Sequence, residues 1–426
     1  MTNKWILSAL LLSSASILAL PAAAQTPATE APAAFATPTL AKDAGSQSVS
    51  NGIAEPPGDT YQLDQQVYET VHDVSTGLGP VFNGRACAEC HQNPVSGAAS
   101  QFTEVRVGSF NAQGTFVNPT VTINDGANTI TGRSIINDRS ITPAAQEHVP
   151  VGETVHATRA VLSSLGDGFV EAIPDATLQA VAAAQPGQSG GFVHGEAIEV
   201  PILEAAGQTK VGRFGWKDQD PTVLSFMGDA YLNEMGVTNR LKPHDVTTVG
   251  KETADPEDVP DALGLADIDH FAQFVRGLQA PPRDTVLAAT PDAVAGQAIF
   301  EQIGCAVCHV ESFTTAPAGT VINGGTYTIP AAIGNKIIHP FGDYLMHDIG
   351  TGDGIFQAGP VDTTFKLRTE PLWGLRMRPR YMHDLASPTL ESAIERHLNE
   401  AVFASNNFFR LTPEEQQQLF TFLNTL

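Results

Sequence analysis

The stretch GRACAECHQNP, residues 84–94, places two cysteines three positions apart with a histidine directly behind them. The same pattern returns in IGCAVCHVES, residues 303–312, and these two motifs contain all 4 cysteines of the chain. Two thiols on one helical turn can each add to one haem vinyl group, while the adjacent imidazole faces the iron. The sequence therefore predicts two covalent haem c groups. The predicted attachment and iron-binding residues are Cys87, Cys90 and His91 in the first motif and Cys305, Cys308 and His309 in the second.

Zinc binding and dithiol chemistry are the alternatives for these cysteines. Both pairs together could bind one zinc ion, and either pair could form a redox-active disulfide in an exported protein. Neither alternative explains why a histidine follows each pair. The flanks of the two motifs also agree, because Phe82 and Phe300 each stand five positions before the first cysteine. This internal similarity predicts two cytochrome-c-like modules.

The N-terminal residues 1–24 have the pattern of a cleaved signal peptide. Lys4 precedes an apolar run over residues 5–20, and small residues at 22–24 form a cleavage site. This pattern predicts a mature protein in a bacterial periplasm. Residues 25–56 are rich in Pro, Ala, Thr and Ser, which predicts a disordered linker. No later apolar run is long enough for a membrane span.

The charge of the chain limits its partners. It has 46 acidic and 23 basic residues, for a formal net charge of −23. Such a surface repels phosphate backbones, so nucleic acid is not an expected partner. We expect instead a soluble electron donor or acceptor, such as a cationic cytochrome or a cupredoxin.

Helical periodicity and proline suggest where one domain ends and the next begins. ADIDHFAQFVRGL, residues 266–278, has apolar residues at helical spacing and is followed by Pro281 and Pro282. We therefore expect an N-terminal domain over residues 57–283 and a C-terminal domain over residues 284–426, each cytochrome-c-like with one haem. The C-terminal domain should end in a helix that begins at the capping box of Thr412 to Glu415.

The N-terminal domain is about twice as long as a minimal haem c module and therefore contains an insertion. Residues 102–110, 115–124 and 128–132 favour β-structure between Gly and Asn turns. The predicted fold is thus mainly α with β-hairpin insertions. The hairpins could cover a haem edge or simply add to the surface.

One histidine outside the motifs is a candidate iron ligand. In LASPTLESAIERHLNEA, Ser387 and Pro388 suggest a helix start, and His397 then falls on the apolar face with Leu398. A histidine on such a face is usually a hydrogen-bonded core residue. Met382 is the competing ligand, and core packing is its ordinary role.

Several segments resemble a known family. GPVFNGRACAECHQNPVSG, HPFGDYLMHDIGTG and RYMHDLASPTLESAIERHLNEA resemble the di-haem oxidoreductase, putative peroxidase family, in order from about residue 77 to the C-terminus. The layout is more distantly similar to the bacterial di-haem cytochrome c peroxidases and to the enzyme that matures tryptophan tryptophylquinone. The resemblance implies an oxidoreductase that transfers electrons between two haems, with peroxidase-type chemistry at one of them.

The resemblance also bears on the sixth ligand of the second haem. In those relatives it lies 14 residues after the His of a Tyr-x-His segment, and it is a Met or a Tyr. Here that His is His383 in YMHD, and the position 14 residues later is His397. We therefore expect His397 to be the ligand, which would make the second iron bis-histidine.

The first haem is less well determined by the sequence. His148, His156, His194 and Met235 are candidate sixth ligands, and an open position would make this haem the site for hydrogen peroxide. Peroxide cleavage needs an acid or base, and a carboxyl with a raised pKa can serve. The resemblance suggests Glu234, which follows a Pro-Thr-Val segment. Glu171 is the other candidate.

Two further implications of the resemblance remain open. The relatives place an indole between the haems, and Trp216 and Trp373 lie in matching segments, although core packing would equally explain both. The relatives also bind calcium between their domains, but Arg378 and Pro379 align poorly with their ligands, so calcium is not firmly predicted. The main alternative function is a non-enzymatic di-haem electron carrier, in which both irons are six-coordinate.

Overall fold

The computed structural model describes residues 27–33, 50–251 and 256–426. The predicted signal peptide lies outside these residues. Part of the predicted linker is described, and it differs from the expected disorder: Thr29–Glu30 form strand β1, which pairs in parallel with β15 (Lys336–Ile338). The backbone hydrogen bonds of this pairing hold the described N-terminal residues against the C-terminal half of the chain.

The described residues contain 11 α-helices. They are α1 (Tyr61–Glu69), α2 (Cys87–Cys90), α3 (Asp167–Glu171), α4 (Asp175–Gln188), α5 (Val223–Met235), α6 (Asp267–Gly277), α7 (Thr285–Ala288), α8 (Pro291–Ile303), α9 (Leu390–Glu395), α10 (Val402–Phe408) and α11 (Pro413–Leu423).

The same residues form 17 short strands. Besides β1 and β15 they are β2 (Val81–Phe82), β3 (Thr103–Phe110), β4 (Phe116–Val117), β5 (Val121–Thr122), β6 (Thr129–Ile130), β7 (Ile135–Ile136), β8 (Arg139–Ser140), β9 (Val155–Ala160), β10 (Glu199–Pro201), β11 (Thr209–Val211), β12 (Phe313–Thr314), β13 (Val321–Ile322), β14 (Tyr327–Thr328), β16 (Met346–His347) and β17 (Leu367–Arg368). They build one four-stranded sheet around β3, the three-stranded sheet β1-β15-β12 and five pairs. The fold is therefore mixed, and the expectation of a mainly α protein is met only in part.

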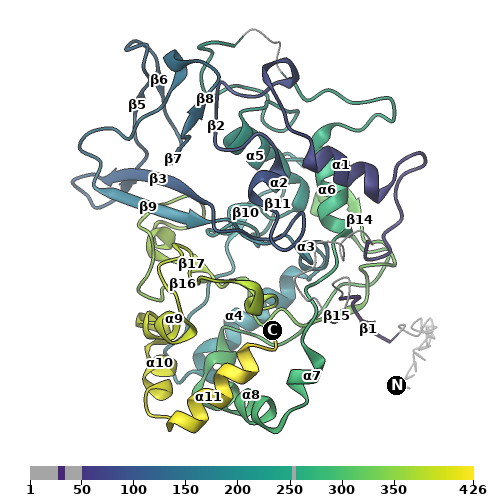
Figure 1. The fold of residues 1–426 in the computed structure, drawn as a ribbon, viewed down its shortest axis with the longest axis vertical. Helices are drawn as coiled ribbons and strands as arrows, with labels where there is room; N and C mark the ends of the chain where they lie inside the picture. The colour runs from purple at the N-terminus through teal and green to yellow at the C-terminus, as the bar shows by residue number, and fades with distance from the viewer. Residues whose placement is uncertain (1–26, 34–49, 252–255) are drawn as a thin grey trace, which may run out of the picture.

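Helices gather in two separate regions, one for each half of the chain (Figure 1). In the N-terminal half α1 packs against α6, where the ring of Tyr68 lies 4.8 Å from that of Phe274. In the C-terminal half α8 packs against α11, where the rings of Phe300 and Phe422 are 5.2 Å apart. Each cysteine motif follows the first helix of such a pair, so each motif is placed against its own apolar core.

The helices around the second motif have the ends that their sequences predict. α11 begins at Thr412 and has the expected capping box with Glu415. α8 ends at Gly304, which has a φ of 100° directly before Cys305. A Cβ at Gly304 would lie 2.3 Å from the ring of Phe403. Only glycine fits here, so Gly304 both ends the helix and lets the chain turn into the motif.

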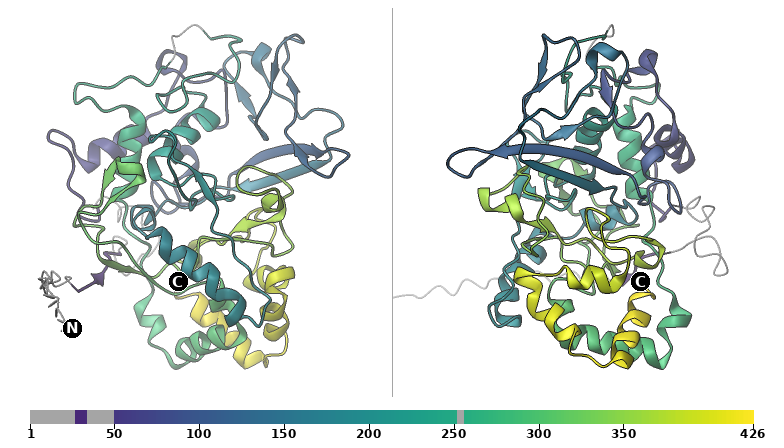
Figure 2. Two further views of the ribbon diagram at one scale, coloured as in Figure 1. Left: turned by 180° about the vertical axis from the view of Figure 1, so that it is seen from behind. Right: turned by 60° about the vertical axis from the view of Figure 1, so that its left-hand side comes forward.

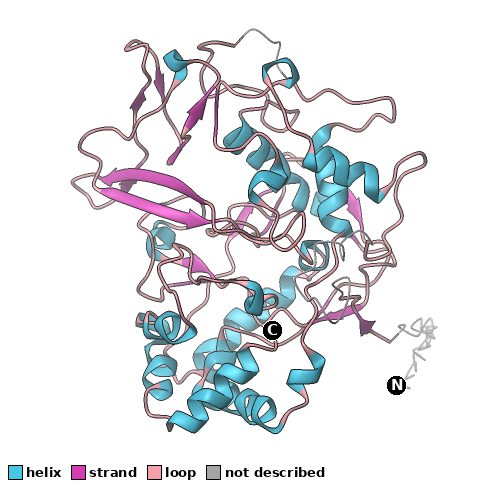
Figure 3. Cartoon of the chain, in the orientation of Figure 1, coloured by secondary structure: helices cyan, strands magenta, loops and turns pink. Residues whose placement is uncertain are grey.

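The insertion in the N-terminal half is built on the long strands β3 and β9. They pair antiparallel from Thr103 with Ala160 to Gly108 with Val155. Figure 3 shows these two strands as the longest in the molecule. The β-structure predicted for this part of the chain is confirmed.

One helix of the N-terminal half lies with the C-terminal helices. Both views in Figure 2 place α4 beside the C-terminal half. At its end Gln185 donates hydrogen bonds to the carbonyl of Val307, at 3.0 Å, and to Asp343, at 2.6 Å. A helix of the N-terminal half therefore supports the second motif. No helix within the described ranges is both long and apolar enough to cross a bilayer.

Candidate functional site

The second cysteine motif opens onto a large cavity. Cys305 and Cys308 form no disulfide, and His309 follows a 3-10 turn over Cys305–Val307. The cavity has about 1340 Å³ of empty space, including its open mouth, and its exposed lining is mostly apolar. Residues 390–405 form much of the opposite wall. Such a space suits a large, flat and mainly apolar ligand.

Two histidines face each other across this cavity. The ring centres of His309 and His397 are 6.5 Å apart. The Nδ1 of His309 donates to the carbonyl of Phe341 at 3.0 Å, and the Nδ1 of His397 donates to the carbonyl of Ala393 at 2.7 Å. These bonds orient both rings and leave each Nε2 for a ligand.

Both rings are neutral at ordinary pH. Burial, and then the neighbouring His397, lower the pKa of His309 to about 4. Burial also lowers the pKa of His397. A neutral imidazole has the free electron pair that a metal ion needs.

The helix that carries His397 differs from its prediction. α9 begins after Thr389, whose side chain caps it, and ends at Glu395 rather than continuing through His397. Leu398 is consequently 45% exposed, although the expected helix placed it on the buried face. The inward position of His397 is nevertheless confirmed, because it lines the cavity. Met382, the competing ligand, lines it as well.

The first motif lies on the short helix α2. Cys87 and Cys90 stand at its two ends and form no disulfide, and His91 is the residue after it. Burial lowers the pKa of His91 to about 4, so this imidazole is also neutral. Cys87 packs against the larger apolar core, which combines residues of the N-terminal half with C-terminal residues such as Phe313 and Tyr344.

Glu234 contacts the segment that leads into the first motif. The side-chain amide of Asn83 donates to its Oε2 at 2.9 Å, and the backbone N–H groups of Asn83 and Gly84 donate to its carbonyl at 2.7 and 3.2 Å. Burial, and then the charge of Glu104, raise the pKa of Glu234 to about 8. Glu234 therefore carries a proton at neutral pH, which is the state that a general acid requires.

Glu104, in strand β3 of the insertion, affects the pKa of Glu234. Burial alone would raise the pKa of Glu104, but the adjacent Arg106 guanidinium lowers it. Glu104 stays ionised, paired with Arg106, and its charge keeps the proton on Glu234. The sequence analysis missed Glu104. The available signal was the spacing of Glu104 and Arg106, which places both side chains on one face of a strand.

Much of the chain matches a known protein family. Residues 146–426 match the family described as Di-haem oxidoreductase, putative peroxidase. The chain belongs to this family. The predicted resemblance is thus confirmed, and the family implies haem cofactors and a di-haem redox role. The matched residues include the second motif, and the first lies N-terminal to them.

Two solved structures are similar to this di-haem oxidoreductase. The Kuenenia stuttgartiensis hydrazine synthase, in a structure pressurised with 20 bar xenon, is 14% identical, with a TM-score of 0.37 and coverage of 98% of this chain and 100% of that chain. A MauG-like protein associated with microbial copper homeostasis is 23% identical, with a TM-score of 0.24 and coverage of 38% of this chain and 52% of that chain. A search of curated proteins found no match.

The cavity of this di-haem oxidoreductase fits a haem iron held by two imidazoles. His309 and His397, with ring centres 6.5 Å apart and each Nδ1 bonded to a backbone carbonyl, would hold a haem iron through their remaining ring nitrogens. The residues present therefore fit the cofactor that the family implies.

Glu171 lies in an environment that does not suit acid–base catalysis. It is fully buried and accepts hydrogen bonds from Arg276, the amide of Asn323 and the backbone of Val223. Burial alone would raise its pKa, but Arg276 and Lys210 lower it to about 2. A carboxylate with this pKa and these bonds keeps its charge, so we assign Glu171 a structural role.

We expect Glu171→Ala to destabilise the protein by about 3–5 kcal/mol, because the buried Arg276 loses its partner. Urea unfolding at pH 7 measures this change. In the wild type the pKa of Glu171 falls from 4.5 to about 2 on folding, so this stabilisation is present above pH 4.5 and is lost as the pH falls through 2. Asp362→Asn, which breaks the exposed pair with Lys366, is the control and should cost about 1 kcal/mol or less. Equal losses in the two variants would contradict the assignment.

The other candidates for the first haem occupy different surroundings. His148, His156 and His194 are exposed and bond to Asn124, to the carbonyl of Glu153 and to the carbonyl of Gly191, respectively. Met235 is buried at the end of α5, next to Glu234. Met235 is thus next to the residue that bonds to Asn83 and Gly84, just before the first motif.

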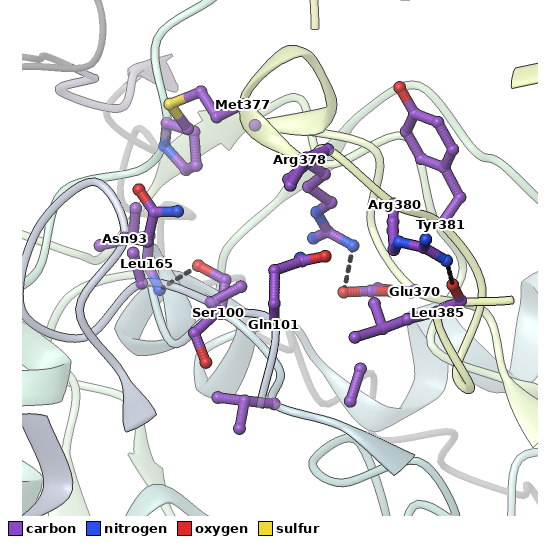
Figure 4. Close-up of a pocket in the computed structure, with 18 of the residues that line it drawn as sticks. Asn93, Ser100, Gln101, Leu165, Glu370, Met377, Arg378, Arg380, Tyr381 and Leu385 are labelled. Atoms are coloured by element: carbon purple, nitrogen blue, oxygen red, sulfur yellow. Dashed lines mark hydrogen bonds and ion pairs between the residues drawn. The ribbon is translucent and has the colours of Figure 1, made fainter. Parts of the chain in front are cut away.

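A second, smaller cavity lies between residues 93–101, which follow the first motif, and residues 370–385 of the C-terminal half. Figure 4 shows Asn93, Ser100 and Gln101 on one side and Arg378 with its partner Glu370 on the other. Trp216 lines both this cavity and the one beside His309, and its indole N–H donates to the carbonyl of Ala160 at 2.8 Å. Trp373 lines only the smaller cavity. The other residues that line both are Glu370, Arg378, Tyr381 and Met382.

Proposed function

We propose that this chain is a periplasmic c-type cytochrome that transfers electrons between two covalent haems and reduces hydrogen peroxide at the N-terminal one. The thiols of each motif attach one haem, and His91 and His309 are the proximal ligands. The observation that best supports this proposal is a difference between the two motifs. His397 faces His309 at 6.5 Å, whereas the first motif has a proton-bearing Glu234 beside it.

The helix packing supports two cytochrome-c-like domains. In each half a helix that precedes the motif packs against the last helix of that half, α1 against α6 and α8 against α11. A domain boundary near residue 283 is part of this proposal, with α4 as an N-terminal element that completes the C-terminal site.

In this proposal the residues of the two sites have different roles. Bound haem iron supplies the electron transfer and the position at which peroxide binds. His309 and His397 hold both sides of the second site, which leaves no place there for a substrate. Reduction of one hydrogen peroxide to two waters would take two electrons from the soluble donor and two protons, one of which Glu234 would supply; the charge of Glu104 helps to keep that carboxyl protonated.

The residues around the cavities suggest a route for electrons, and the charge of the chain suggests which partner supplies them. Trp216 lines both the cavity beside His309 and the smaller cavity that Asn93 lines, two residues after His91, and electron passage through this indole is part of the proposal. The net charge of −23 suits a cationic cytochrome or a cupredoxin as the soluble electron donor. The N-terminal residues 1–24 support export to the periplasm.

Spectroscopy of the oxidised protein tests the ligand assignment. We expect one low-spin, bis-histidine haem that does not change when hydrogen peroxide is added. His397→Ala should convert this haem to another ligation, seen in the visible and EPR spectra. His194→Ala is the control, because the exposed imidazole of His194 bonds to the carbonyl of Gly191 and the substitution leaves its backbone unchanged. An unchanged spectrum in His397→Ala would remove the assignment.

The same measurements separate the enzyme from an electron carrier. We expect the half-reduced protein to show a second, high-spin haem that reacts with hydrogen peroxide. Two six-coordinate haems without reaction in any redox state would instead establish the non-enzymatic carrier.

A further inference from the structure

A separate group of ionisable side chains lies where α1 meets α6. Asp59 and Asp64 come from the start of α1, and His270 comes from α6; all three are buried. The Nδ1 of His270 lies 2.6 Å from Asp64 Oδ1 and 3.7 Å from Asp59 Oδ2. Each residue offers one ligand atom, and the three atoms lie within 4.8 Å of one another.

Two carboxyl oxygens of this group receive no hydrogen bond from any described basic or amide group, although the Glu55 and Asp64 carboxyls lie next to each other. Among the described residues, Asp64 Oδ2 and Glu55 Oε1 are buried without a hydrogen bond. The side chain of Asp64 has no exposed surface. Leaving a buried carboxylate oxygen unpaired costs about 1–3 kcal/mol or more. Asp59 is better satisfied, since Thr60 N–H and the amide of Gln273 both donate to it.

Carboxyl groups outnumber basic groups here. Asp59, Asp64 and Asp261 lie around the single imidazole of His270, and Glu55 lies beside Asp64. A divalent cation would balance charge that these side chains do not balance among themselves.

Asp261 gives the imidazole a defined orientation. Its Oδ2 lies 3.5 Å from Nε2 of His270, on the side away from Asp59 and Asp64. Histidines that bind a metal ion commonly donate their other ring N–H to a carboxylate in this way.

We propose that Asp59, Asp64 and His270 bind one divalent cation, with Glu55 at its outer side. An imidazole ligand beside carboxylates favours Mn²⁺ or Zn²⁺, whereas Ca²⁺ prefers oxygen ligands throughout. The cation would tie α1 to α6, the helix pair that packs beside the first cysteine motif through Tyr68. Its role is structural and independent of the redox function.

Metal binding to the full-length di-haem protein tests this site. After treatment with a chelator, we expect equilibrium dialysis with Mn²⁺ or Zn²⁺ to give one tightly bound ion per chain. Binding should raise the Tm and release protons at pH 7, because the cation replaces protons on the carboxyls and on Nδ1. Asp64→Asn and His270→Ala should each weaken binding more than about 10-fold. Asp362→Asn, at an exposed ion pair, is the matched control and should bind like the wild type.

Glu55→Gln provides a milder variant, because Glu55 is only half-buried. It should fold normally and weaken binding by about 10-fold. Absence of a stoichiometric ion in the wild type would overturn the proposal, as would unchanged affinity in Asp64→Asn. Binding of Ca²⁺ but neither Mn²⁺ nor Zn²⁺ would overturn the assignment of His270 as a ligand.

Discussion

Replacement of both Cys305 and Cys308 by alanine should leave one covalent haem per chain instead of two. Thioether bonds form only at cysteine sulfur, and these two thiols are the ones beside the cavity that His309 and His397 share. The denatured protein should lose the mass of one haem, and the bis-histidine low-spin signal should disappear. Mass spectrometry of the denatured, mature protein and EPR of the native protein measure the two effects.

The matched variant replaces Cys87 and Cys90 by alanine. It should also lose one haem, but the bis-histidine signal should remain, because His309 and His397 are unchanged. This pair of variants therefore assigns each spectrum to one motif. Two haems in either variant would contradict covalent attachment at the replaced cysteines, and free thiols at all four positions of the wild type would remove the c-type assignment.

Replacement of Glu234 by glutamine should lower peroxide turnover by about 10²–10⁴-fold, the usual contribution of a positioned acid or base. The amide keeps the shape and the hydrogen bond from Asn83 but cannot give up a proton as an acid does. Both haems should remain, because no thiol or histidine changes. Stopped-flow measurement of peroxide reduction by the reduced protein gives the rate. Wild-type turnover in this variant would show that Glu234 is not the acid.

The pH dependence of the wild type follows from the same group. Glu234 holds its proton below its pKa of about 8, so peroxide turnover should fall as the pH rises through 8. Glu104→Gln removes a neighbouring negative charge that helps to raise this pKa. The alkaline decline should therefore begin at lower pH in Glu104→Gln, while the ligand spectra stay the same. A decline at the wild-type pH would show that Glu104 does not act on Glu234.

Local features of this protein could be predicted from sequence because neighbouring residues decide them. The helix over residues 267–277 and the cap at Thr412 follow from apolar spacing and from side chains within one helical turn. The β-structure of the insertion follows from alternation. The helix expected through His397 was too long, since no local signal marked its end at Glu395.

The roles of the buried carboxyls could not be predicted in this way. Glu234, suggested by the resemblance, and Glu171 were both candidates in the sequence, yet Glu171 pairs with Arg276, 105 residues away, and Glu234 lies beside Glu104. Whether a buried carboxyl is held charged or protonated depends on the charge that packs against it. That partner is set by the packing of distant segments.

The amino-acid sequence by itself determined the two Cys-x-x-Cys-His motifs and the family, because thiol spacing and motif order are properties of the chain, and the resemblance to that family singled out His397 as the expected ligand. Only the tertiary structure decided that His397 faces His309, that the insertion supplies Glu104, and that His270 meets Asp64 across 206 residues. These contacts form when separate helices and strands bury their apolar faces together, and burial then gives each contact its electrostatic effect.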